Sequence, residues 1–163
     1  MSEHLIPFVA LRSETLAKEF LTRLPDVDLH SFEKDQIDFI ATLRPDPEFP
    51  TPGFMPFAAI VWGTDRAISS EEVASRFANR KWIQERQKGY RKFFMPVIAL
   101  VFSVSDDAGY FAWVAKPLQE SGTKLHLIDD LECSKIGRSS LGEIVAEVRG
   151  WYEILAPEML AIH

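Results

Sequence analysis

The stretch "VIALVFSVSDDAGYFAWVA", from Val97 to Ala115, decides the fold class of this chain. Its first half is a run of β-branched and apolar residues, which predicts a strand buried on both faces. "DDAG" then supplies residues that favour a turn, and "YFAWVA" follows as a second apolar run. We therefore predict a hairpin of two strands in the interior of a sheet.

Helical patterns lie on both sides of this hairpin. Apolar residues recur at helical spacing after Ser13, a candidate N-cap, and this first helix is expected to stop at Pro25. A second helix is predicted over residues 71–95, with acids in its first turn and bases towards its end. The closing helix is expected to begin with a capping box formed by Ser140 and Glu143.

Three further strands complete the predicted sheet. Ile37 and Phe39 alternate with polar residues, the run from Phe57 to Trp62 is apolar, and "KLHLID" is expected as a short edge strand. This order of elements predicts an α/β fold, with a mixed sheet of four to five strands flanked by helices. The length of 163 residues favours a single domain over residues 1–163.

The charge of the chain is unevenly distributed. The net charge is −6, which is the wrong sign for a protein that binds nucleic acid over its whole surface. Residues 71–95, however, carry seven bases against three acids, while the remainder has 11 bases against 21 acids. Contact with phosphates or with an acidic protein is one interpretation, and a solvated helix face is the other. The candidate binding residues on this segment are Arg76, Arg80, Lys81, Arg86 and Lys88.

Several classes of site have no support in the sequence. Cys133 is the only cysteine, and the four histidines are scattered without ligand spacing, so we predict no structural metal. Nucleophile elbows, phosphate-binding glycine loops and H-E-x-x-H are not found. The chain also lacks a signal peptide and an apolar run long enough to cross a bilayer, so we expect a cytosolic protein without membrane contacts.

Four segments together resemble a known family. They are "QIDFIATL", "FAAIVWGTD", the basic helix of residues 71–95 and "MPVIALVFSVSDDAGYFAWVAKP". In this order they resemble the restriction-endonuclease-like fold of the PD-(D/E)XK nucleases and, more narrowly, the bacterial domain-of-unknown-function family 4365. The resemblance covers roughly residues 10 to 117, and it implies a restriction-endonuclease-like sheet.

The resemblance also implies where a nuclease site would lie. The family holds Mg²⁺ with a carboxylate on one strand and an oxygen ligand on the next, and a lysine two residues later activates a water. Asp38 matches the carboxylate, but the second ligand falls on Ile60 and the lysine falls on Trp62. Gly63 and Thr64 match the Gly-Thr that follows in the family, which supports this register.

Isoleucine and tryptophan can neither bind Mg²⁺ nor act as a base, so our first hypothesis is a degenerate nuclease fold without a cofactor. Such a protein would act as a binding module, and an acidic surface favours a protein partner or self-association over nucleic acid. The resemblance suggests a bacterial defence, toxin or mobile-element system as the setting. In this hypothesis Asp38 is vestigial, accepting backbone hydrogen bonds, and Trp62 fills the core.

Two alternatives stay open. The first is an active Mg²⁺-dependent nuclease with a rearranged site, which would use Asp38, a helix acid such as Glu14 or Glu19, and a lysine such as Lys81 or Lys88. The second is a non-catalytic binder of nucleic acids or nucleotides. It would use the basic segment of residues 71–95 and Trp62 as a stacking platform for a base.

Overall fold

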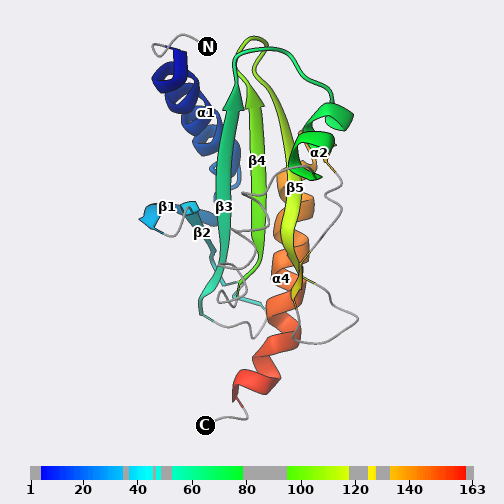
Figure 1. The fold of residues 1–163 in the computed structure, drawn as a ribbon. Coiled ribbons are helices and arrows are strands. Elements are labelled where there is room, and N and C mark those ends of the chain that lie inside the picture. The colour runs from blue at the N-terminus through cyan, green and yellow to red at the C-terminus, as the bar shows by residue number, and fades with distance from the viewer. Residues whose placement is uncertain are drawn as a thin grey trace.

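The fold is an α/β arrangement in which helices cover both faces of a mixed sheet. The computed structural model describes residues 5–34, 37–45, 47–48, 53–78, 95–117, 125–127 and 133–160. Within these ranges the helices are α1 (Leu5–Leu21), α2 (Ser70–Ala78) and α4 (Ser140–Leu160). α1 and α4 pack on one face of the sheet, and α2 packs on the other (Figure 1). The predicted α/β class is therefore confirmed.

The sheet contains more strands than the sequence analysis predicted. Its order is β1-β2-β3-β4-β5-β6, and β7 pairs separately with β5. Among the strand pairs described, β3 and β4 are parallel and all other neighbours are antiparallel. The prediction of four to five strands was too low, whereas the predicted central hairpin, β4 with β5, is confirmed. The strands are β1 (Val27–Lys34), β2 (Ile37–Leu43), β3 (Met55–Thr64), β4 (Val97–Ser103), β5 (Ala108–Pro117), β6 (Leu125–Leu127) and β7 (Ser134–Lys135).

Two strands, β1 and β7, were not predicted, and few of their described side chains are buried. β1 forms one edge of the sheet. Among its described side chains, only that of Val27 is buried. β7 has two residues, and both are exposed. An alternating apolar pattern develops only when one face of a strand enters the core, so neither segment carries a clear strand signal.

Helix α1 begins earlier than predicted. Ser13 is not an N-cap, because it lies in the middle of the helix, where its side chain is 1% exposed and donates a hydrogen bond to the Val9 carbonyl at 2.7 Å. Pro7 is compatible with the earlier start, since the first turn of a helix leaves its N–H groups without intrahelical partners. The helix ends at Leu21, ahead of the predicted stop at Pro25.

The other two predicted helices are present, with one correction. α2 begins at Ser70, next to the predicted start, and residues 79–94 of the predicted basic helix lie outside the described residues. α4 follows the predicted amphipathic pattern, but the capping box was wrong. Ser140 Oγ accepts a hydrogen bond from the Gly137 N–H at 2.8 Å, and Glu143 instead accepts one from the Ser139 hydroxyl at 2.9 Å.

Two buried tyrosines tie the layers together. Tyr152 on α4 donates its hydroxyl to the Pro56 carbonyl at 2.5 Å, which holds α4 against the start of β3. Tyr110 on β5 donates to the Ile68 carbonyl at 2.6 Å, on the side of the sheet that α2 covers. These bonds satisfy buried polar groups on both faces, and they attach α4 to β3 and the segment before α2 to β5. None of the described helices is long and apolar enough to span a membrane.

Candidate functional site

Asp38 lies where strands β2 and β3 separate. Their paired register ends at Phe39 opposite Ala59, one residue short of Asp38. The Val61 N–H, two residues further along β3, donates a hydrogen bond to Asp38 Oδ2 at 2.7 Å. Where the two strands diverge, the Asp38 carboxylate thus accepts the hydrogen bond that a backbone carbonyl accepts in regular strand pairing.

A cavity of about 300 Å³ opens at this divergence. The first half of α1 lies beside the carboxyl end of β3 (Figure 1). Four residues of this helix line the cavity. Glu14 of α1, Asp38 of β2 and Trp62 of β3 all line this space. The described residues that line this space, which we call the Asp38 cavity, are Val9, Ala10, Ser13, Glu14, Asp38, Val61, Trp62 and Gly63.

The close contact between α1 and β3 depends on Gly63. A Cβ atom at this position would lie 1.9 Å from Ser13 Oγ and 2.9 Å from Val9 Cγ1, which is closer than real Cβ atoms approach. The absence of a side chain therefore lets α1 pack against the end of β3 and form the wall of the Asp38 cavity. This contact of Ser13 was not predicted from the sequence, because the residue was expected at the start of the helix.

The structure brings together some of the candidate site residues. Asp38, Trp62 and Glu14 line one cavity, whereas Glu19 faces a different one. Ile60, at the position of the second family ligand, is 5% exposed and packs in the core on the α2 side of the sheet. Arg76 lies on α2, but its side chain lies outside the described residues, as do Arg80, Lys81, Arg86 and Lys88.

These side chains do not fit the Mg²⁺ site that the family resemblance implies for an active nuclease. Mg²⁺ needs oxygen ligands in near-octahedral geometry, but an alkyl chain and an indole occupy the positions of the second ligand and the lysine. Asp38 Oδ2 already accepts the Val61 N–H. Among the described residues, no group of three or more His, Cys, Asp or Glu side chains is placed to hold a metal ion.

The bond from Val61 to Asp38 predicts a structural role for this carboxylate. We expect Asp38→Ala to lower the free energy of unfolding by about 1 to 2 kcal/mol, because the Val61 N–H would lose its acceptor. Asp38→Asn should lower it less, since the amide oxygen can still accept. Urea unfolding followed by circular dichroism measures both. Equal stability of Asp38→Ala and the wild type would contradict a structural role for the bond.

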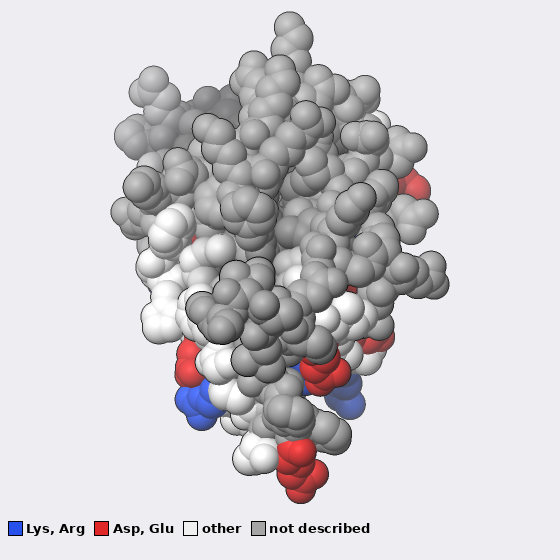
Figure 2. All heavy atoms as spheres, turned by 90° about the horizontal axis from the view of Figure 1, so that it is seen from below, with Lys and Arg blue, Asp and Glu red and all other residues white. Residues whose placement is uncertain are grey.

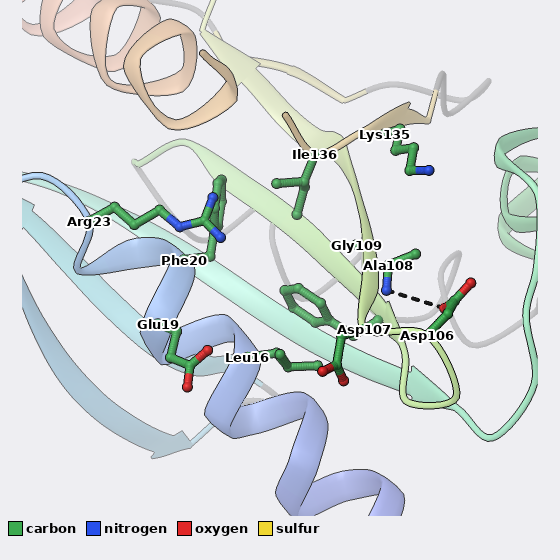
Figure 3. Close-up of a pocket in the computed structure, with 11 residues that line it drawn as sticks. Leu16, Glu19, Phe20, Arg23, Asp106, Asp107, Ala108, Gly109, Lys135 and Ile136 are labelled. Atoms are coloured by element: carbon green, nitrogen blue, oxygen red, sulfur yellow. Dashed lines mark hydrogen bonds between the residues drawn. The ribbon is translucent and has the colours of Figure 1, made fainter. Parts of the chain in front are cut away.

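A second cavity, of about 340 Å³, lies between the later turns of α1 and the start of β5. Figure 3 shows Phe20 and Arg23 on one side of it and Gly109 and Ile136 on the other. Its charged lining mixes three acids with two bases: Glu19, Asp106, Asp107, Arg23 and Lys135.

Two of these acids already have protein partners. Asp107 forms an ion pair with Arg12, and Asp106 accepts a hydrogen bond from the Ala108 N–H at 3.2 Å, drawn as a dashed line in Figure 3. A hydrogen bond from Ser103 and the Ala108 bond together lower the pKa of Asp106. The described lining of the second cavity therefore carries both signs of charge and does not select a ligand of one charge.

Charges on the lower end of the molecule are mixed as well. Figure 2 shows both signs among the described residues of this face, without either gathering into a continuous patch. The ion pair of Arg44 with Asp28, at 2.7 Å, joins the end of β2 to β1 on the surface. The Asp38 cavity differs from these surfaces because its described lining contains carboxylates and no base.

Cys133 is a poor candidate for a nucleophile. Burial raises the pKa of its thiol to about 11. Because the thiolate is the reactive form, we expect iodoacetamide at pH 8 to label the native protein about 100-fold more slowly than the urea-unfolded chain. The native rate should rise with pH up to about 11, where the thiol ionises. Mass spectrometry measures both rates, with Cys133→Ser as the blank, and equal rates would show that the thiol is exposed.

Comparison with known protein families, with curated proteins and with solved structures gave no match to this chain.

Proposed function

We propose that this protein is a catalytically degenerate relative of the restriction-endonuclease-like nucleases that works by binding a protein partner. The observation that carries the proposal is the environment of Asp38. Its carboxylate bonds to the β3 backbone, while Ile60 is buried in the core and Trp62 lines the cavity beside it. These side chains supply neither the second oxygen ligand nor the lysine that hydrolysis of a phosphodiester in this family needs.

The arrangement of strands also supports the family resemblance. A helix precedes three consecutive antiparallel strands, and a helix then leads to β4, which is parallel to β3. This is the order in which the segments resembling the nuclease family occur along the chain. Asp38 lies at the end of the β2–β3 pairing, where the family would place its first carboxylate.

The proposed binding surface is the first half of α1 together with the Asp38 cavity. Phe8 and Leu11 on this helix are 58% and 65% exposed, although both are large apolar side chains. They neighbour Val9 and Ala10, which line the cavity. Exposed apolar side chains beside a cavity are typical of surfaces that bind other proteins.

The first test is a nuclease assay on single- and double-stranded DNA and RNA with Mg²⁺ and Mn²⁺. We expect no cleavage by the wild type or by Asp38→Ala. Cleavage by the wild type that Asp38→Ala abolishes would refute the proposal in favour of a rearranged active site. Binding of labelled DNA or RNA that weakens steeply with salt, and is lost in Arg80→Glu/Lys81→Glu, would instead favour the nucleic-acid binder.

The second test asks whether α1 contacts another protein. A photocrosslinking amino acid is placed at Leu11 and, as a matched control, at Thr22, an exposed residue just after the same helix. We expect a specific cross-linked product from Leu11 alone, and a complex of the purified partners that persists in EDTA. Sedimentation velocity over a range of concentrations reveals self-association in the same samples. A complex that dissociates when metal is removed would contradict the proposal.

A further inference from the structure

We propose that the Asp38 cavity receives an arginine side chain of the partner. This inference rests on the proposed function, because it assumes that a protein binds to this face. It follows from the lining of the cavity: five of its eight described residues are apolar or glycine, two are carboxylates and none is basic. A ligand that fits such a space has an apolar stem and a cationic head, which is the form of an arginine or lysine side chain.

The two carboxylates come from different elements and can approach one ligand from two sides. Asp38 projects from β2, and its Oδ2 is positioned by the Val61 N–H. Glu14 projects from α1 and pairs with Lys18 at 3.2 Å, but both side chains of this pair are about half exposed. An exposed pair of this kind contributes little to stability, so an incoming cation can replace Lys18 at modest cost.

Trp62 favours arginine over lysine. Trp62 is half-buried and lines the cavity between Val61 and Gly63, and it also packs against the core on the α2 side of the sheet. A guanidinium group is planar, stacks on aromatic rings and is more weakly hydrated than an ammonium group. It also presents several N–H donors, so it can bond to two carboxylates while its face lies against the indole.

The surroundings of the cavity have the composition of a protein-binding site centred on one buried side chain. Phe8 and Leu11 provide exposed apolar surface close to the cavity on the same helix. Interfaces often place a buried arginine at the centre of such a patch, where the surrounding contacts exclude water. Outside residues 71–95 the chain has 11 bases against 21 acids, so the electrostatic field of this part also attracts a basic partner.

The test uses Nα-acetyl-arginine amide as the probe and its neutral isostere Nα-acetyl-citrulline amide as the control. The protein, which has four tryptophans, is labelled with 5-fluorotryptophan so that each gives its own ¹⁹F resonance. The resonance that is absent from the Trp62→Phe variant is assigned to Trp62. We expect the arginine probe to shift the Trp62 resonance in a saturable way. The Kd should be on the order of 10 mM, because a single side chain makes few contacts. The citrulline probe should leave it unchanged.

Variants locate the site. We expect the Asp38→Asn/Glu14→Gln double variant to weaken binding of the arginine probe at least ~10-fold, as loss of two charge-assisted contacts predicts. Glu153→Gln, which removes an exposed acid on α4, should bind as the wild type does. Circular dichroism confirms that each variant is folded, and Asp38→Asn retains an acceptor for the Val61 N–H.

Two results would overturn the inference: equal shifts with arginine and citrulline, or an arginine effect that the double variant does not reduce. If either occurs while the complex through α1 still forms in EDTA, the binding function stands and only the arginine occupant is wrong. Cleavage of nucleic acid that depends on Asp38 would instead refute the proposed function itself.

Discussion

Gly63→Ala should lower the free energy of unfolding by about 3 kcal/mol, because the added methyl group has no space between α1 and β3. Its Cβ would lie 1.9 Å from Ser13 Oγ. Ser13 cannot easily move away, since its side chain is 1% exposed and bonds to the Val9 carbonyl within the same helix. Either α1 or the end of β3 must shift, and both form walls of the Asp38 cavity.

Gly142→Ala is the matched control for this prediction. Gly142 lies in α4, and a Cβ there would meet nothing within 4 Å. Alanine is favoured over glycine in a helix, so this change should raise stability by about 0.5 to 1 kcal/mol. Urea unfolding of the two variants therefore separates the general effect of a glycine-to-alanine change from the overlap specific to Gly63.

A second variant tests the cause of the loss. Ser13→Ala removes the oxygen nearest to the new methyl group, although Val9 Cγ1 still lies 2.9 Å from it. We expect Gly63→Ala to cost about 1 kcal/mol less in the Ser13→Ala background than in the wild type, because residues in direct contact are not additive. If Gly63→Ala is as stable as the wild type, α1 does not pack on β3 as closely as described.

Phe39→Ala should destabilise the protein more than any change at its neighbour Asp38, by about 4 kcal/mol. The Phe39 ring is 1% exposed and lies in the core that α1 and α4 cover. Removing it leaves a void in this core, since protein interiors are close-packed. The midpoint of urea unfolding measures the loss, and a value close to that of the wild type would place Phe39 outside the core.

Thr42→Ala provides the comparison on the opposite face of the same strand. Thr42 is half-buried, and its hydroxyl has no hydrogen-bond partner within the described structure. Removing a polar group that bonds to nothing is nearly neutral, so we expect a change within about 1 kcal/mol. The contrast between the two variants tests which face of β2 enters the core.

The alternation of β2 illustrates what could be predicted from the sequence. Ile37 and Phe39 are buried, as their spacing indicated. Ala41 is buried as well, and the intervening residues are half-buried. This pattern placed Asp38 on a strand but could not identify its partner, because the Val61 N–H belongs to a segment 23 residues away. Contacts of this kind depend on where the pairing of two strands ends, which no local pattern encodes.

Some of the residues that line the Asp38 cavity could also be predicted from the sequence. The resemblance to the nuclease family led to Asp38 and Trp62, and both line the same cavity. Ser13 and Gly63 were not recognised as contacts, because the start of α1 was misplaced and a glycine's lack of a side chain is informative only when its neighbour is known. The basic residues at 80, 81, 86 and 88 lie outside the described residues, so their proposed binding role stays a prediction.

The sequence by itself determined the α/β class, the central strand pair and the amphipathic closing helix, because each depends on hydrophobic periodicity over adjacent residues. The tertiary structure alone decided that β3 and β4 are parallel, that β1 extends the sheet and that α1 lies against Gly63. It also decided that Glu14, and not Glu19, is the acid of α1 that lines one cavity with Asp38 and Trp62. The tendency of each residue to be buried follows from its own side chain, so it can be read from the sequence. Contacts between side chains that are distant in the sequence form only when whole helices and strands pack together.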